Sequence, residues 1–433
     1  MNHVQPAPDA PAKRRLRILL SAYACEPDKG SEPGIGWRWA LGLARAGHEV
    51  WVITRTNNAG AIEHALAGRR DAGPQFVYYD LPRWASGWKR GARGVRTYYI
   101  LWQWGAYRLA RRLCRNTRFD VVHHITFGVF RHPSFMAFLG VPFVFGPVGG
   151  GEAAPRELRA TFPLHGRVID GARDVANWMV RIDPLMAAVY RRSSAILCKT
   201  GETRDAIPAR YRGKCRVQLE VGIDDPGERS IQPHTREDGR FRILYVGRLV
   251  YLNGVHLALA ALARLRRTHP QATLTVIGSG PDEAWLRRAA RRLGADEAVT
   301  WIPWLERAAV MRAYAGHDAF LFPSLHDSSG NAVLEALASG LPVVCIATGG
   351  PAVLADASCA FLVPPGKPGE TVEALAAALA RLADDNVLAR SMFEAAVLRA
   401  RQQFSWDRQV ARMEQLYRSA LPAPPARGAE ATR

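Results

Sequence analysis

The sequence has few cysteines and no long apolar run, and each shortage excludes a class of protein. None of the six cysteines in the 433 residues belongs to a C-x-x-C pair or lies at metal-ligand spacing from a histidine, so neither a disulfide framework nor a zinc site is predicted. No window has the roughly 20 apolar residues that a transmembrane helix needs, and the opening MNHVQPAPDAPAKRR lacks the apolar stretch of a secretory signal. We therefore expect a cytoplasmic protein with reduced thiols.

Acidic residues are outnumbered by basic ones. With 58 Lys and Arg against 39 Asp and Glu, the net charge is +19, which suits nucleic acid, an anionic membrane or anionic substrates. Only six of the basic residues are lysine, and an Arg/Ala-rich composition is also what GC-rich coding produces. The position of the charge is therefore more informative than its total.

Strand patterns alternate with helical patterns in two successive halves. Residues 17–23 (RILLSAY) and 242–246 (RILYV) are apolar runs, each followed by a Gly-bearing loop, a helical pattern and another apolar run. Strand–helix–strand units with short connections form parallel, doubly wound sheets. The length also exceeds what one hydrophobic core usually supports. We therefore predict an α/β protein of two Rossmann-like domains facing a cleft.

The strongest chemical signal is the stretch 322–345 (FPSLHDSSGNAVLEALASGLPVVC). The pattern predicts a strand at 319–322, a loop at 323–329 and a helix at 331–339 that ends before Gly340. Backbone N–H groups at a helix start have no intrahelical partner, and they form an anion site suited to a diphosphate.

Two carboxylates flank this predicted helix start. Asp327 lies in the loop and Glu335 lies one turn inside the helix. Both can face one ligand and accept hydrogen bonds from ribose and sugar hydroxyls. The alternative is ordinary capping of the helix by Ser and Asp side chains.

Several motifs, in order along most of the chain, resemble glycosyltransferase family 4. The acidic-x7-Glu spacing of Asp327 and Glu335 resembles the E-x7-E region of that family. The other motifs that carry the resemblance are VGRLVYLNGVHLALAAL, VIGSGPDEAWL, CIATGGPAVL, FLVPPGKP and the C-terminal FSWDRQVARMEQLYRSAL. The resemblance implies the GT-B fold, a nucleotide-sugar donor and retention of the anomeric configuration.

Composition and the strand pattern predict the domain boundaries, and the resemblance implies the roles of the two domains and of the C-terminal helix. The expected segments are a disordered tail at 1–15, an N-terminal Rossmann-like acceptor domain at 16–221, a linker at 222–240, a C-terminal Rossmann-like nucleotide-sugar domain at 241–403, a helix at 404–420 that crosses back to the N-terminal domain, and a disordered tail at 421–433.

Roles for individual residues of the C-terminal half follow from the same resemblance. Arg248 would neutralise the donor diphosphate, which suits bidentate guanidinium geometry, and Glu335 would hold the ribose. Asp327 takes the place of the family's first glutamate, near the sugar ring. Backbone N–H groups for the phosphates would come from Ser328, Ser329, Gly330 and Asn331.

Two residues depart from the family pattern. Asn253 stands where the family has a lysine, so it can donate a hydrogen bond but brings no charge. Asp327 is one methylene shorter than glutamate. Because the chain also has no D-x-D sequence, we expect metal-independent transfer without a cofactor, in which Arg248 and oriented N–H groups stabilise the leaving diphosphate.

In the N-terminal half, three residues are candidates for the same site. Gly34 and Gly36 would let the loop GSEPGIGW approach the phosphates, since glycine permits close backbone approach. His123, directly after Asp120-Val-Val, matches a histidine that often lies near the donor sugar. The alternatives are that the glycines only turn the chain and that the histidine is structural.

Residues 83–118 are both basic and aromatic. They hold ten Lys/Arg, no Asp or Glu, and an interleaved set of Trp and Tyr. Such a composition suits the interface of an anionic bilayer. The alternatives are a Trp/Tyr stripe that packs on the N-terminal sheet, or single-stranded nucleic acid, for which no recognisable motif is present.

We therefore predict a bacterial enzyme that moves a sugar from UDP- or GDP-sugar to a lipid-linked or surface glycan (exopolysaccharide, capsule or lipopolysaccharide) at the inner face of the cytoplasmic membrane. One rival is a non-catalytic, membrane-associated sugar-nucleotide-binding scaffold, which Asn253 favours. The other is an NAD(P)-dependent oxidoreductase. Against it, this sequence has no G-x-G-x-x-G motif directly after a predicted strand, which dinucleotide binding requires.

Overall fold

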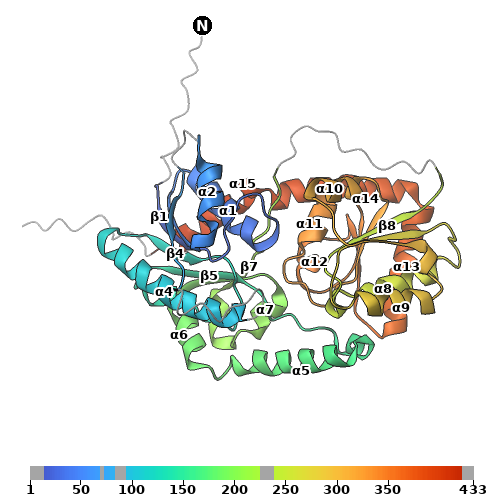
Figure 1. Cartoon of the computed structure of the whole chain (residues 1–433), viewed down its shortest axis with the longest axis horizontal. Helices are drawn as coiled ribbons and strands as arrows, with labels where there is room; N and C mark the ends of the chain where they lie inside the picture. The colour runs from blue at the N-terminus through green and yellow to red at the C-terminus, as the bar shows by residue number, and fades with distance from the viewer. Residues whose placement is uncertain (1–13, 69–72, 83–93, 225–237, 422–433) are drawn as a thin grey trace, which may run out of the picture. The chain divides into compact units, whose positions relative to one another are not determined.

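The computed structural model describes residues 14–68, 73–82, 94–224 and 238–421 (Figure 1). The tails expected at 1–15 and 421–433 and the linker expected at 222–240 lie largely outside these residues, as does the first part of the basic, aromatic segment.

Within the described residues, the first sheet has seven strands in the order β3-β2-β1-β4-β5-β6-β7. β1 is an inner strand and pairs in parallel with β2 and β4. The strands are β1 (Arg17–Ser21), β2 (Glu49–Thr54), β3 (Gln75–Tyr78), β4 (Val121–His124), β5 (Phe143–Val148), β6 (Ser193–Cys198) and β7 (Cys215–Val217).

The second sheet, counted over the same residues, has six strands in the order β10-β9-β8-β11-β12-β13, all in parallel pairs. The chain order reverses between β8 and β11, and ligands of open parallel sheets bind at the carboxyl ends of strands near such a point. The strands are β8 (Arg242–Val246), β9 (Thr273–Ile277), β10 (Val299–Ile302), β11 (Ala319–Phe322), β12 (Val343–Ile346) and β13 (Ala360–Val363).

Helices connect the strands of both sheets (Figure 1). Those of the first half are α1 (Ser31–Arg45), α2 (Ala59–Leu66), α4 (Val95–Asn116), α5 (Leu164–Met179), α6 (Pro184–Arg192) and α7 (Gly201–Ala206). Those of the second half are α8 (Val255–Leu265), α9 (Glu283–Arg292), α10 (Arg307–Ala315), α11 (Asn331–Ala338), α12 (Gly349–Leu354), α13 (Pro368–Asp384), α14 (Asn386–Phe404) and α15 (Trp406–Ala420).

By its internal contacts the chain divides into two compact units. The first comprises Met1–Thr126, Ser134–Val144 and Leu416–Arg433, and the second comprises Phe127–Pro133 and Phe145–Gln415. The second unit contains the whole second sheet together with β6, β7 and most of β5.

The helix after β1 begins earlier than expected. The sequence predicted a loop as far as Gly36, whereas α1 starts at Ser31, so Gly34 and Gly36 both lie in its first turns. A Cβ on Gly34 would lie 2.0 Å from the carbonyl oxygen of Lys29, and one on Gly36 would lie 2.2 Å from that of Ala24. In the structure these glycines therefore let α1 pack closely on the loop that precedes it.

The aromatic residues of α4 belong mainly to the core. Tyr98, Tyr99 and Trp102 are buried, and the rings of Tyr99 and Trp102 each contact the ring of Tyr23 edge-on at 5.1 Å between centroids. Only Trp104 of the described aromatic residues in this segment is half exposed. For Tyr98, Tyr99 and Trp102 the alternative prediction, an aromatic stripe that packs on the N-terminal sheet, is therefore correct. These three rings are not available to contact a bilayer.

Candidate functional site

The loops that follow β8, β9 and β11 meet at the carboxyl edge of the second sheet. Gly254 has a φ of +67°, and a Cβ there would lie 1.9 Å from the carbonyl oxygen of Pro323. Leu325 N–H donates to the carbonyl of Leu252 at 2.8 Å. On the other side, Leu249 N–H donates to the carbonyl of Ser279 at 3.0 Å. The motifs at 247–254, 277–281 and 323–331 therefore form one continuous surface.

The loop after β12 joins the same surface. Gly350 N–H donates to the carbonyl of Asp327 at 2.7 Å. Gly349 has a φ of +59°, and a Cβ there would lie 2.1 Å from that same carbonyl oxygen. The Gly-Gly pair of the CIATGG motif is thus required by close backbone packing against the loop before α11.

The start of α11 is organised by the side chain of Asp327. Its Oδ1 accepts hydrogen bonds from the backbone N–H groups of Ser329 at 2.9 Å and Gly330 at 2.6 Å. Gly330 has a left-handed φ of +67° and forms the N-cap of the helix. Two of the N–H groups that the sequence assigned to the donor phosphates are therefore engaged by Asp327 in this structure. The first-turn N–H groups from Asn331 onward lack intrahelical acceptors, as at any helix start.

Glu335 lies one turn inside α11 and is held from α10. Its Oε1 accepts a hydrogen bond from the guanidinium of Arg307 at 3.0 Å, and its Oε2 lies 3.5 Å from the hydroxyl of Tyr314. Burial raises the pKa of Glu335, and the neighbouring Arg307 opposes that rise. Arg307 and Tyr314 were not predicted from the sequence, because neither belongs to a motif.

Arg248 and Asn253 occupy the loop after β8. The side chain of Arg248 is exposed, and within the part of the chain that the structure describes its guanidinium has no hydrogen bond or ion pair. Asn253 Nδ2 donates to the backbone carbonyl of Arg248 at 2.9 Å, and the hydroxyl of Tyr245 donates to the same carbonyl at 3.2 Å. Asn253 thus fixes the backbone that carries Arg248.

A buried ion pair supports the loop before α11. Lys199 Nζ lies 2.5 Å from Glu220 Oε1, and their side chains are only 6% and 2% exposed. The hydroxyl of Ser329 donates to the same Glu220 oxygen at 2.7 Å and accepts from Lys199 at 3.1 Å. Neither charged residue was predicted. A lysine directly after the strand β6 and a glutamate after β7 were the available signals.

Two further loops of the second unit contact the same region. A Cβ on Gly149 would lie 2.8 Å from the hydroxyl oxygen of Ser328. Glu202 of α7 accepts a hydrogen bond from the backbone N–H of Gly349 at 2.9 Å. The second unit thus brings together Arg248, Asn253, Asp327, Glu335 and the residues 328–331, with their supports Lys199 and Glu202.

His123 is buried at the end of β4, in the first unit. Its Nδ1 lies 2.6 Å from the hydroxyl oxygen of Tyr417 on α15, and the two rings meet edge-on. His123, Gly34 and Gly36 belong to the first unit, whereas the other candidate site residues belong to the second. The roles of these three residues toward a donor therefore stay predictions.

Among the described residues, no group of three or more His, Cys, Asp or Glu side chains is arranged to hold a metal ion. None of the described helices combines the length and the hydropathy that crossing a bilayer would take.

Part of the chain matches a known family of enzymes. Residues 227–399 match the family described as Glycosyl transferases group 1. Over 184 residues the chain is 36% identical to the glycogen synthase of Mycobacterium tuberculosis, a match that covers 42% of this chain and 43% of that protein. Over 188 residues it is 33% identical to the D-inositol 3-phosphate glycosyltransferase of Corynebacterium aurimucosum, covering 41% and 43%. The match thus spans less than half the length of these relatives.

Solved structures resemble almost the whole chain. The lipopolysaccharide outer core galactosyltransferase WaaB, in its apo form, superposes with a TM-score of 0.64 at 14% identity, covering 94% of this chain and 100% of that one. HepE from Anabaena, in complex with UDP and glucose, gives 0.59 at 16% identity, with 94% and 100% covered. The chain therefore has the GT-B fold, and the prediction of two Rossmann-like parallel sheets is confirmed.

Proposed function

We propose that this protein is a retaining, metal-independent glycosyltransferase that takes a sugar from UDP- or GDP-sugar. The observation that carries the proposal is the convergence of four motif loops at the switch point of the second sheet, with Arg248, Asp327 and Glu335 among them. This surface lies within the segment that is similar to the group 1 glycosyl transferases. UDP and glucose bound to HepE, which shares the fold, favour a UDP-sugar donor.

In the proposed mechanism the donor diphosphate binds at the start of α11. The unpaired guanidinium of Arg248 and the first-turn N–H groups from Asn331 stabilise the charge that develops on the leaving diphosphate. Glu335, oriented by Arg307, accepts hydrogen bonds from the ribose hydroxyls. Asp327 lies near the sugar ring, and a role of His123 toward the donor sugar stays a prediction. No divalent metal is needed to neutralise the diphosphate in this scheme.

The proposed acceptor is a lipid-linked or surface glycan at the inner face of the cytoplasmic membrane, as in exopolysaccharide, capsule or lipopolysaccharide synthesis. The arginines of α4 support contact with anionic lipid, since Arg108, Arg111, Arg112 and Arg115 are all exposed. Trp84 and Trp88 lie outside the described residues. Each basic side chain near such a surface adds roughly 1 kcal/mol of attraction.

The test of the donor site uses two substitutions and two matched controls. Glu335→Ala and Arg248→Ala should each weaken donor binding by about 10- to 150-fold, because each removes a charged partner worth roughly 1.5–3 kcal/mol. The controls are Glu394→Ala and Arg390→Ala, which remove an exposed ion pair on α14. Binding is measured by calorimetry against UDP, GDP and their sugars, and turnover by release of nucleotide.

Wild-type donor binding in the two site variants would refute the assignment of the site. Tight donor binding by the wild type without turnover on any glycan acceptor would instead favour the non-catalytic scaffold. Binding of NAD(P) in preference to sugar nucleotides would favour the oxidoreductase.

A further inference from the structure

The helix α5 has its polar side inward and its apolar side outward. Gly166 and Asp170 are its buried residues, whereas Leu164, Val168 and Val175 are each at least 60% exposed. A surface helix of a globular protein ordinarily shows the opposite arrangement, with an apolar stripe toward the core. The inversion calls for a partner on the outer side.

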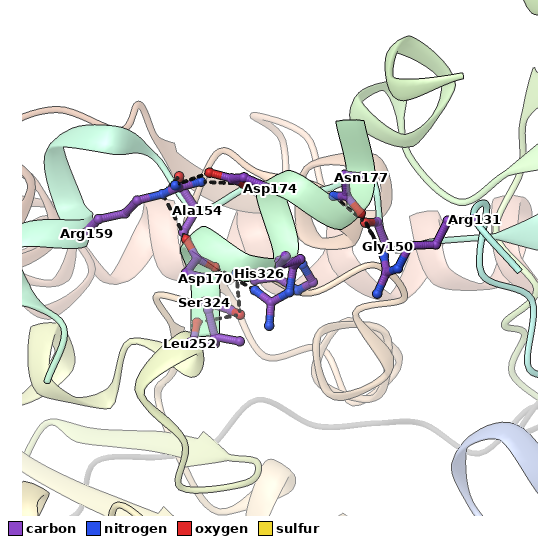
Figure 2. A network of polar contacts seen from close by, with 11 residues as sticks. Arg131, Gly150, Ala154, Arg159, Asp170, Asp174, Asn177, Leu252, Ser324 and His326 are labelled. Carbon is purple, nitrogen blue, oxygen red and sulfur yellow. Dashed lines mark hydrogen bonds and ion pairs between the residues drawn. The ribbon is translucent and has the colours of Figure 1, made fainter. Parts of the chain in front are cut away.

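Polar contacts hold the inward side of α5 from Asp170 to the end of the helix, as Figure 2 shows. The guanidinium of Arg159 lies 2.9 Å from a carboxylate oxygen of Asp170 and 2.5 Å from one of Asp174. Near the end of the helix, Asn177 donates to the carbonyl of Gly150 at 3.0 Å.

The start of α5 is held by close packing. A Cβ on Gly166 would lie 2.9 Å from the ring of Tyr251. Because the inner side is occupied at the beginning, middle and end of the helix, α5 cannot rotate to bury its apolar side.

The outer face carries a regular apolar stripe. Its exposed fractions run from 54% to 78%, so most of each side chain contacts solvent. Within α5 the positions are separated by steps of four, three, four and three residues, which keeps them on one side of the helix. They are Leu164, Val168, Gly171, Val175, Trp178 and Ile182, of which the last follows the end of α5.

The charge around this stripe is positive. Arg167 of α5, Arg181 directly after it and Arg191 at the end of α6 are exposed. The two carboxylates of α5 are compensated by two cations, because Arg159 pairs with both Asp170 and Asp174 and Arg173 also pairs with Asp170 at 2.6 Å. Asp183 caps α6 by accepting from the N–H groups at its start. An anionic surface would therefore meet arginines and no uncompensated carboxylate.

We propose that the outer face of α5, together with Ile182, docks on the surface of an anionic lipid bilayer. A tryptophan at half exposure and arginines bordering an apolar stripe are the composition of helices that lie in the interface plane. A second copy of the chain is less suited, because the stripe covers fewer than three heptads and has glycine at its centre, where a coiled coil needs sustained apolar contacts. The residues of this surface are different from those of the basic segment at 83–118.

The test is co-flotation of the full chain with vesicles of phosphatidylcholine alone or with 30% phosphatidylglycerol. The variant Val168→Asn, Val175→Asn, Trp178→Asn removes the centre of the stripe while leaving the inner contacts untouched. Its matched control is Val387→Asn, Leu398→Asn, which changes two exposed apolar side chains of α14. A third variant, Arg181→Glu, Arg191→Glu, tests the charge.

The wild type should bind the anionic vesicles and release as salt rises, since exposed charges are screened beyond about 10 Å at 0.1 M. Each apolar side chain buried in the interface is worth about tenfold in partitioning, so the triple variant should lose at least 100-fold. The α14 control should bind like the wild type. Circular dichroism and nucleotide-induced thermal shift confirm that the variants are folded.

Wild-type affinity of the triple variant for anionic vesicles, or equal wild-type binding to both kinds of vesicle, would overturn the proposal. A change from dimer to monomer in sedimentation of the triple variant, with vesicle binding unchanged, would assign the face to a second copy instead. Flotation needs no donor or acceptor, so its outcome is independent of the proposed transferase activity.

Discussion

The ion pair of Lys199 and Glu220 allows a sharp test of how the loop before α11 is held. The two side chains are 6% and 2% exposed, with 2.5 Å between Nζ and Oε1. Lys199→Met removes the ammonium group and keeps most of the aliphatic volume. The carboxylate of Glu220 then stays in a low-dielectric environment without its cation. Breaking a buried pair in this way costs about 3–5 kcal/mol of unfolding free energy.

The double substitution Lys199→Met, Glu220→Met separates stability from function. Replacing both members of a buried pair by apolar side chains of similar volume is often close to neutral, so most of the lost stability should return. The hydroxyl of Ser329 nevertheless loses both of its partners. Because Ser329 leads into α11, we expect donor affinity to stay reduced in the double variant, with the donor KM raised and kcat less affected.

The assay is urea and thermal unfolding followed by tryptophan fluorescence, with nucleotide binding measured in parallel. In a unit of this size, each kcal/mol of lost stability lowers Tm by about 2 °C. Lys199→Met should therefore lower Tm by roughly 6–10 °C. The control Arg264→Met removes a bidentate pair with Glu373 whose side chains are 43% and 57% exposed, and it should hardly change Tm, since exposed pairs contribute little. An equal effect of both substitutions would refute the reasoning that Lys199 is desolvated.

Three further predictions concern the chemistry of the second unit. EDTA should leave turnover unchanged, because Arg248 and backbone dipoles are proposed to neutralise the diphosphate; a metal-reversible loss of activity would contradict this. Asn253→Lys should lower the donor KM by adding a cation, while loss of its hydrogen bond to the Arg248 carbonyl should cost about 1 kcal/mol of stability; an unchanged KM would mean that position 253 does not face the donor. Burial lowers the pKa of His256 to about 4, so the folded state binds a proton at this histidine less readily than the unfolded state does. The free energy of unfolding should therefore fall by up to about 3 kcal/mol as the pH drops from 6.5 to 4. The variant His256→Gln should flatten that pH dependence.

The sequence predicted the second sheet and its loops well, for a physical reason. The expected strands at 242–246 and 319–322 coincide with β8 and β11, because short apolar runs bounded by glycine loops leave little choice of element. Contact between the loops then follows from topology, since carboxyl ends of neighbouring parallel strands share one edge.

Judged by local helix propensity, the sequence placed the start of α1 too late. The stretch SEPGIG contains proline and two glycines, which are unfavourable in helix interiors. Proline is tolerated in the first turn, where its missing N–H would have no partner. Gly34 and Gly36 are selected by close contact with the carbonyls of Lys29 and Ala24, and a tertiary contact of this kind is not visible in a single sequence.

Periodicity could have resolved the aromatic residues of α4. Tyr98, Tyr99 and Trp102 fall on the same side of a helix, with Ala106 and Ala110 continuing that side, and all five are buried. The arginines fall on the other side. Composition alone merges the two faces, whereas helical spacing separates a packed stripe from a solvated one.

Neither the Lys199–Glu220 pair nor the inverted polarity of α5 could be predicted from the sequence, for different reasons. The pair joins residues in separate loops, and no local pattern couples them. In α5 the apolar period is plain, but periodicity gives the spacing of a stripe and not the direction in which it faces. Only Arg159, Asp170 and Asp174, in contact on the inner side, show that the polar face is the buried one.

The two departures from the glycosyltransferase family 4 pattern share one structural consequence. Asn253 uses its amide to hold the carbonyl of Arg248, and the short side chain of Asp327 turns back onto the N–H groups of Ser329 and Gly330. The short side chain of aspartate readily accepts hydrogen bonds from backbone N–H groups two or three residues further along the chain. Both positions thus use a polar side chain to fix a loop. Under the proposed function, the charge facing the donor would come from Arg248 and the first turn of α11, and donor binding would depend more on a preorganised backbone than on the number of cations around the diphosphate.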